Sequence, residues 1–241
     1  MKIRLLWAML ALVAIEPASA GQIVTYRGED GRNLILEIGD NGDSRVAGMG
    51  QRPDEVALIV AGELYLVEMA AGAHRVVRLS DLAAVTEEAL GPMFKGLFSK
   101  LGDDMAKAAG ITIRKTGSAR VGQYAGEAYS VVGLDRGKPG KAVRWIASRD
   151  PALGSAGRAM QQFVESTLVL ATPFLGPAVP GMVAENRQLF ALGTPLDAGG
   201  KFTLVSVVPA DIDPARLKLP AEPMSRAALL AELKTQAPAG N

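Results

Sequence analysis

The stretch Asn33–Ile38, Asn-Leu-Ile-Leu-Glu-Ile, followed by Gly39–Asp43, Gly-Asp-Asn-Gly-Asp, carries the pattern that decides the fold. Leu34, Leu36 and Ile38 recur at every second position, which is the spacing of a strand with one buried face. The Gly, Asp and Asn residues after this run are typical of a tight turn. We therefore expect a half-buried strand that ends in a turn, and similar short runs flank it on both sides.

Five further runs between residues 22 and 79 have the same form, short and apolar with turn residues between them. Asp30-Gly31 is the dipeptide that tolerates the positive φ angles of a two-residue hairpin turn. Together with Asn33–Ile38, these runs predict a meander of about six antiparallel strands. The other strands are expected at Gln22–Arg27, Ser44–Gly48, Val56–Ala61, Leu64–Met69 and Arg75–Leu79.

A helical stretch follows the meander. Leu82–Leu90 is the first expected piece, and Gly91-Pro92 is expected to end it and to begin a second piece. In that second piece apolar residues recur every three or four positions up to Gly110, which indicates an amphipathic helix lying on a sheet face. Its apolar residues are Met93, Phe94, Leu97, Leu101, Met105 and Ala108.

The second half of the chain repeats strands and then helices. Further strands are expected at Ile111–Lys115, Ser118–Val121, Glu127–Leu134 and Ala142–Ser148. Asp150-Pro151 is expected to open a helix on which Met160, Phe163 and Val164 share one face.

The segment after that helix contains several prolines and glycines. Thr172–Met182 is apolar and interrupted by Pro and Gly, so we expect neither a long helix nor an interior strand there. Leu189–Leu192 and Phe202–Val208 are expected to be the last strands, and residues 221–241 to form a short helix and a tail. The pattern predicts an α+β protein with one domain over residues 21–220.

The N-terminal residues have the form of an export signal. Lys2 and Arg4 precede an apolar run, Leu5–Ile15, and Ala18-Ser19-Ala20 has the small residues of a cleavage site. We expect residues 1–20 to be a cleaved signal peptide and the protein to be periplasmic. Gly21 stands where a lipoprotein would have Cys, and no further run is long enough to span a bilayer, so no membrane anchor is expected after cleavage.

Composition excludes several classes of function. Lys plus Arg number 26 against 25 Asp plus Glu, which indicates no nucleic-acid partner. With no Cys and one His, His74, the chain has no thiolate metal site and no His-rich metal site. We find no phosphate-binding loop, no nucleophile elbow and no placed pair of carboxylates, so we expect no catalytic residue, no metal and no cofactor.

The remaining candidates are apolar residues of the two helices and of the Pro-rich segment. One interpretation is that all of them are core. The other is that a curved sheet and its helices enclose a cavity for a lipid or acyl chain, with Thr172–Met182 as a mobile lid. The candidate cavity or lid residues are Phe94, Leu97, Leu101, Met105, Met160, Phe163, Val164, Phe174 and Leu175.

The order of elements resembles that of a known group of exported proteins. The residues that carry the resemblance are Thr116-Gly117, Gly122-Gln123-Tyr124, Tyr129, the strand around Trp145, and the late stretch Asp213–Pro220. They are similar to exported, mostly uncharacterised bacterial families with a LolA- or LolB-like fold. That resemblance implies a strongly curved, half-open antiparallel β-barrel with two or three helices packed over its concave side.

The resemblance also implies a function, which we hold as an expectation. It implies a periplasmic, non-enzymatic protein whose concave apolar face holds acyl chains or another hydrophobic partner, such as an envelope protein. Two alternatives remain open, an envelope scaffold or sensor domain with a self-filled core and a hydrolase that uses carboxylates alone. The sequence does not indicate the identity of the ligand or the oligomeric state.

Overall fold

The structure is a computed structural model that describes residues 21–48, 55–107, 110–138 and 140–236. The expected signal peptide, residues 1–20, lies outside the described residues, as do the last five residues of the expected C-terminal tail. Within these ranges the chain forms an α+β structure built on one antiparallel sheet of 11 strands, which is not closed into a barrel.

The first six strands form the expected meander. Each strand pairs with the next, and the turns between them use residues that tolerate positive φ, such as Gly31 and Gly42. Asp43 stabilises one of these turns by accepting a hydrogen bond from the backbone of Ala61 at 2.9 Å. The strands are β1 (Gly21–Gly28), β2 (Asn33–Gly39), β3 (Ser44–Ala47), β4 (Val56–Val60), β5 (Glu63–Ala70) and β6 (Ala73–Arg78).

The remaining strands join the meander through its first strand. The sheet order is β6-β5-β4-β3-β2-β1-β11-β10-β9-β8-β7, so β1 lies beside β11 in the middle of the sheet. Val24 pairs with Val207 in this contact, and the register shifts between Thr25 and Tyr26. The later strands are β7 (Thr112–Val121), β8 (Tyr124–Val132), β9 (Ala142–Ser148), β10 (Thr194–Ala198) and β11 (Phe202–Ala210).

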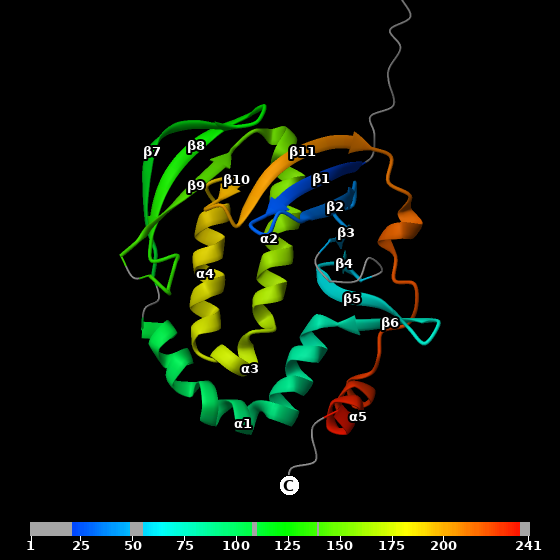
Figure 1. Cartoon of the computed structure of the whole chain (residues 1–241). Helices are drawn as coiled ribbons and strands as arrows, with labels where there is room; N and C mark the ends of the chain where they lie inside the picture. Colours follow the sequence, from blue (N-terminus) through cyan, green and yellow to red (C-terminus); the bar gives the residue numbers. More distant parts are fainter. Residues whose placement is uncertain (1–20, 49–54, 108–109, 139, 237–241) are drawn as a thin grey trace, which may run out of the picture.

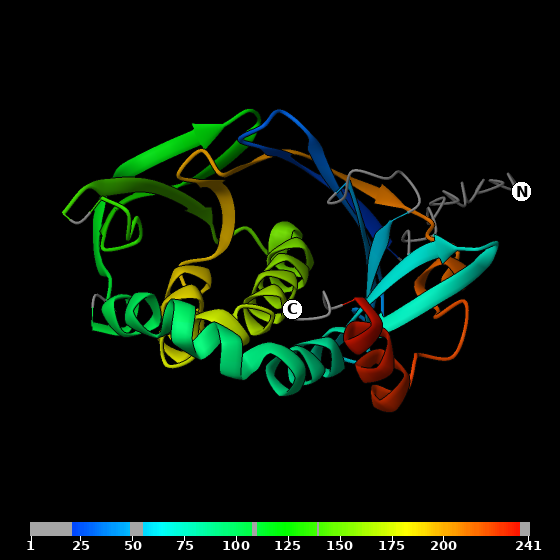
Figure 2. The same cartoon turned by 60° about the horizontal axis from the view of Figure 1, so that its bottom comes forward.

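The sheet curves around two antiparallel helices, α2 (Gly154–Val169) and α4 (Ala178–Phe190). In the sequence both helices lie between β9 and β10. In Figure 2 these helices lie on the concave side of the sheet. The helix α1 (Leu79–Lys107) connects the edge strand β6 to the opposite edge strand β7 and runs across the open side. A short helix, α3 (Thr172–Leu175), joins α2 to α4 and packs against α1.

The main core lies between the sheet and α2. Tyr26, Leu36 and Leu196 are fully buried there, and Met160 of α2 packs against them with 2% of its surface exposed. The Tyr26 hydroxyl donates a hydrogen bond to the backbone carbonyl of Pro195 at 3.1 Å, so the one polar atom of this side chain is satisfied. The core therefore ties the meander to the second half of the sheet.

The C-terminal segment returns along the meander. A short 3-10 helix, Pro214–Leu217, places Arg216 within 2.6 Å of the carboxylate of Glu37 on β2. The last helix, α5 (Arg226–Gln236), buries Leu229 against Val77 and Val85. The expected helix in residues 221–241 is therefore present, and it packs near the beginning of α1.

One expected helix break and one expected strand are wrong. Gly91-Pro92 lies inside α1, which continues to Lys107, and Figure 1 shows this long helix bowed along its length. A proline within a helix removes one backbone hydrogen bond and bends the helix, and here it does not end it. The expected strand at Leu189–Leu192 is also wrong, because Leu189 and Phe190 are the last residues of α4.

The helical conformation of the Pro-rich segment has a simple reason. Pro173 lies in the first turn of α3, and Pro180 lies at the third residue of α4. The first backbone N–H groups of a helix have no partner within it, so a proline costs little at these positions. The prolines of Thr172–Met182 therefore begin helices, and the missed strand β10 follows α4 instead.

Candidate functional site

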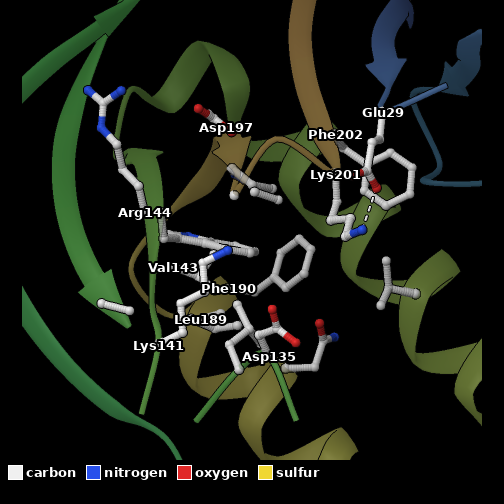
Figure 3. A pocket seen from close by; sticks show the side chains of 18 of the residues that line it. Glu29, Asp135, Lys141, Val143, Arg144, Leu189, Phe190, Asp197, Lys201 and Phe202 are labelled. Carbon is white, nitrogen blue, oxygen red and sulfur yellow. Dashed lines mark hydrogen bonds and ion pairs between the residues drawn. The ribbon is translucent and has the colours of Figure 1, made fainter. Parts of the chain in front are cut away.

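A pocket of about 710 Å³ opens at the end of the helical pair, between α2, α4, β9 and the turn that joins β10 to β11. Pockets of about 300–1,000 Å³ are the usual size for small-molecule sites. Its lining comes from segments far apart in the chain, including Glu29 after β1 and Phe202 at the start of β11. Figure 3 shows Phe190 in the middle of this lining, with Lys201 and Phe202 on one side and Val143 on another.

The apolar part of the pocket is built around two aromatic residues. Trp145 of β9 is 5% exposed, and its ring meets the ring of Phe190 at the end of α4, with centroids 6.3 Å apart and an interplanar angle of 73°. Edge-to-face contacts of this kind stabilise both rings beyond the burial of their area. Met160 and Val164 of α2 also belong to the apolar part of the pocket. They are four residues apart, and side chains at that spacing share one face of a helix.

One glycine allows two walls of the pocket to approach closely. Gly199 has a φ of +66°, and a Cβ atom built on it would lie 2.2 Å from Cγ1 of Val143. Gly200 follows with a φ of +79°, and a Cβ atom built on Gly200 would have no other atom within 4 Å. The turn after β10 therefore needs a glycine at residue 199 both for its backbone conformation and for its contact with β9.

A buried ion pair fixes the loop between β8 and β9 to α4. The Arg136 guanidinium lies 2.6 Å from Glu185, and their side chains are 13% and 8% exposed. The same Glu185 accepts a hydrogen bond from the backbone of Gly110 at 2.6 Å, just before β7. One carboxylate thus fixes two loops to the helix, and breaking a buried pair of this kind is expensive because one charge is left uncompensated.

The outer edge of the pocket is charged. Glu29 and Lys201 form an ion pair there, which Figure 3 marks with a dashed line. The Glu29 carboxylate raises the pKa of the exposed Lys201 ammonium above its usual value through this hydrogen bond and its charge, and Asp135 contributes a smaller effect. Lys141 and Arg144 also lie at the edge, and Asp197 accepts a hydrogen bond from Gly200 at 2.7 Å.

Of the seven candidate residues whose side chains the structure describes, Met160 and Val164 line this pocket and the other five do not. Phe163 belongs to the main core, with 7% of its surface exposed. Leu101 on α1 and Phe174 on α3 are 48% and 37% exposed, and Met105 and Leu175 are half-buried. Phe94 and Leu97 lie within α1, and their side chains are outside what the structure describes.

The residues that sequence reasoning missed are Trp145, Phe190, Phe202 and the charged groups around them. The expected strand Ala142–Ser148, which contains Trp145, is confirmed as β9, but the sequence pattern of that strand gives no sign of a pocket. The sequence pattern predicts a strand at Phe190, whereas the structure places this residue on α4, four residues after Asn186 on the same helix face.

No group of three or more His, Cys, Asp or Glu residues able to hold a metal ion occurs among the residues that the structure describes. His74 is exposed at the start of β6, outside the lining of this pocket. None of the helices within the described ranges is both long enough and apolar enough to cross a membrane.

Comparisons with protein-family models, with curated proteins and with solved structures find no match for this chain. The site is therefore interpreted from its own geometry, which is an apolar, aromatic floor with a charged rim and an opening to solvent. An arrangement of this kind is suited to holding an amphipathic small molecule.

Proposed function

We propose that this chain is a periplasmic, non-enzymatic binding protein that holds a lipid or an acyl chain in the pocket between α2, α4 and β9. The observation that carries the proposal is the 710 Å³ pocket with the Trp145–Phe190 pair on its floor. An acyl chain in this space would remove apolar surface from water, which is favourable by about 25 cal/mol per Å². The aromatic edges and Met160 offer it a surface without competing hydrogen bonds.

We also propose that the curved sheet is of the LolA- and LolB-like half-open barrel type. The arrangement that supports this is an antiparallel sheet with α2 and α4 on its concave side and α1 across its open side. In this account the apolar interior is divided between the core around Phe163 and the separate pocket around Trp145.

Native mass spectrometry of the full chain, purified without detergent, tests the proposal together with calorimetric titration of dodecanol. We expect a protein species that carries a lipid-sized adduct, and saturable binding of dodecanol. Val164→Trp places a large side chain in the pocket and should abolish both signals. Val169→Trp is the matched control, since Val169 lies on the same helix, is 37% exposed and is outside the pocket lining.

The proposal fails if the protein is recovered empty and dodecanol does not bind, or if Val164→Trp and Val169→Trp bind dodecanol equally.

A separate measurement tests the export. The intact mass of protein recovered by osmotic shock should correspond to a chain that begins at Gly21, and a mass that retains residues 1–20 would contradict cleavage.

A second candidate is an envelope scaffold or sensor domain with a self-filled core. The observation that favours it is the packing of Met160 and Phe163, two expected cavity residues, against buried residues of the sheet. For such a domain, Val164→Trp would change stability without changing the binding of any small molecule, and the titration above separates the two functions.

A further inference from the structure

The positive charge of the chain is concentrated at one end of the sheet. From the beginning of β7 to the end of β9, residues 112–148 contain seven Lys and Arg residues against two Asp and Glu residues. The rest of residues 21–241 has the opposite balance, with 17 basic and 22 acidic residues. Figure 1 shows β7, β8 and β9 together at the end of the sheet that lies far from α5. A chain that divides its charge in this way favours an anionic partner at its basic end.

Three of these seven basic side chains already have partners. Lys115 forms an ion pair with Glu127, Arg136 forms the buried pair with Glu185, and Arg120 donates a hydrogen bond to a backbone carbonyl in the turn between β7 and β8. The other four are exposed, and within the described part of the chain none of their side chains has an ion pair or a hydrogen bond. We call these four side chains the basic patch, which consists of Arg114, Lys138, Lys141 and Arg144.

Strand pairing places the two arginines of the basic patch on the outer face of the sheet. Arg114 of β7 and Arg144 of β9 both pair with Ser130 of β8, and residues paired across neighbouring strands share a face. Trp145 follows Arg144 and packs on Phe190 of α4, so Arg144 belongs to the face away from that helix. Figure 3 shows the Arg144 side chain directed away from Phe190. Two strand spacings separate the Cα atoms of the two arginines by about 10 Å.

The two lysines of the basic patch lie on the loop that joins β8 to β9. The backbone N–H of Lys141 donates a hydrogen bond of 3.1 Å to the carbonyl of Lys138, which closes a turn there. Arg114 and Arg144 are each two residues from the end of their strand that is next to this loop. At about 3.3 Å per residue, this places both arginines about 7 Å from the strand ends. The four cations therefore gather at one end of the three strands.

The basic patch continues into the edge of the pocket, because three of its four members belong to the pocket lining. Asp135 and Asp197 line the same pocket, and with both ionised the patch still has two net positive charges. The third acidic residue, Glu29, is paired with Lys201 and lies across the pocket from Lys141 in Figure 3. An apolar floor beside a basic edge matches a surface that contains both acyl chains and anionic head groups.

We propose that the basic patch docks the protein on an anionic lipid surface, with the edge of the pocket facing the head groups. The choice of a lipid surface rests on the proposed function, because an acyl chain comes from an assembly of lipids or passes to one. Each basic side chain near such a surface strengthens binding by a factor of about five. The same surface repels the negative remainder of the chain, which orients the protein with β7, β8 and β9 toward the lipid.

Co-sedimentation of vesicles with the protein recovered by osmotic shock tests this inference. Vesicles of phosphatidylglycerol and phosphatidylcholine in equal parts are compared with vesicles of phosphatidylcholine alone. We expect binding to the anionic vesicles in about 0.02 M salt and no measurable binding to the neutral ones. In about 0.5 M salt, binding to the anionic vesicles should be at least about tenfold weaker, because salt screens exposed charges.

A variant that neutralises the basic patch should weaken binding to the anionic vesicles by at least about a hundredfold. Circular dichroism shows whether this variant is folded. A single substitution outside the pocket lining, Arg114→Gln, should weaken binding by about fivefold, and it keeps the inference testable if the combined variant does not fold. The combined variant carries Arg114→Gln, Lys138→Gln, Lys141→Gln and Arg144→Gln.

The matched control removes the same number of positive charges from exposed residues outside β7, β8 and β9. It should keep its affinity for the anionic vesicles within about threefold, because these residues do not face the lipid in the proposed orientation. The control carries Arg27→Gln, Arg158→Gln, Lys218→Gln and Lys234→Gln.

Equal binding to anionic and neutral vesicles would overturn the inference, as would equal losses in the patch variant and in the control. Failure to bind either kind of vesicle would also overturn it, and saturable binding of inorganic phosphate in calorimetry would then assign the patch to a small soluble anion. A protein that binds dodecanol and no vesicle contradicts this inference alone. A protein that binds anionic vesicles through the patch and does not bind dodecanol contradicts the proposed function alone.

Discussion

The indole ring of Trp145 and the phenyl ring of Phe190 meet at 73°, with centroids 6.3 Å apart, at the point where β9 faces the end of α4. This contact joins a strand and a helix through two residues that are 45 positions apart in the sequence. It forms the floor of the pocket and packs beside Leu189, which is 2% exposed. The same contact therefore contributes to both the stability of the fold and the shape of the site.

Phe190→Ala should lower the free energy of unfolding by about 2–3 kcal/mol, because it removes the aromatic contact and leaves a space beside Trp145. Urea unfolding followed by circular dichroism measures this loss. Leu101→Ala is the control on a large apolar side chain that is 48% exposed on α1, and it should cost less than half as much. Equal losses for the two variants would show that Phe190 has no special role in packing.

Gly199→Ala and Gly200→Ala separate a steric effect from a backbone effect. Both glycines have positive φ angles, and only Gly199 would place a Cβ within 4 Å of another atom. Gly200→Ala should cost about 1 kcal/mol through its backbone conformation alone. Gly199→Ala should cost about 1–3 kcal/mol more, because Val143 must move, and should also weaken dodecanol binding.

Thermal and urea unfolding of the two variants check this difference. If both alanine variants lose the same stability and bind dodecanol equally, the close approach between the turn and β9 is not a feature of the protein in solution.

Removing one member of the buried ion pair should be costly. Glu185→Ala leaves Arg136 without its partner and Gly110 without an acceptor, so the free energy of unfolding should fall by about 3–5 kcal/mol. The control is Arg187→Ala, since Arg187 is 65% exposed in its pair with Glu165 and should contribute at most about 1 kcal/mol. Urea unfolding of both variants measures the contrast, and a loss below that of Arg187→Ala would contradict the role of Glu185.

Tyr26 makes the stability sensitive to alkaline pH. Burial raises the pKa of its phenol well above the usual value, so the folded protein keeps the proton at a pH where the unfolded chain has lost it. The stabilisation is complete below pH 10, the pKa of an unfolded tyrosine, and is lost above it by up to about 1.4 kcal/mol for each pH unit.

Urea midpoints measured from pH 9 to pH 11 test this behaviour with Tyr26→Phe as the comparison. The variant should start less stable, because the hydrogen bond to Pro195 is lost, and its stability should fall less steeply with pH. An equally steep decline in the variant would assign the alkaline sensitivity to other groups.

The strands of the first half could be predicted because each carries its own local signal. Leu34, Leu36 and Ile38 alternate along β2, and turn residues separate it from β1 and β3. The helix α4 could not be predicted in this way, because Pro180 suggests a break unless its position in the first helical turn is known. The strand β10 was missed for the related reason that Pro195 argues against an interior strand.

The pocket could be predicted only in part. Met160 and Val164 were chosen for their common helix face, and both line it. Trp145, Phe190 and Phe202 come from three different elements, and the pairing of β1 with β11 and the insertion of α2 and α4 bring these elements together. No short-range pattern encodes that arrangement, since it depends on contacts between residues far apart in the chain.

The most direct test of the central proposal is the ¹H–¹³C spectrum of the protein labelled at its methionine methyl groups, recorded during a titration with dodecanoate. Met160 lines the pocket and is 2% exposed, whereas Met69 is 39% exposed on β5 and outside the pocket lining. We expect a saturable shift of the Met160 signal, assigned through Met160→Leu, with the Met69 signal unchanged. A Met160 signal that does not move while dodecanoate is present in excess would contradict binding in this pocket.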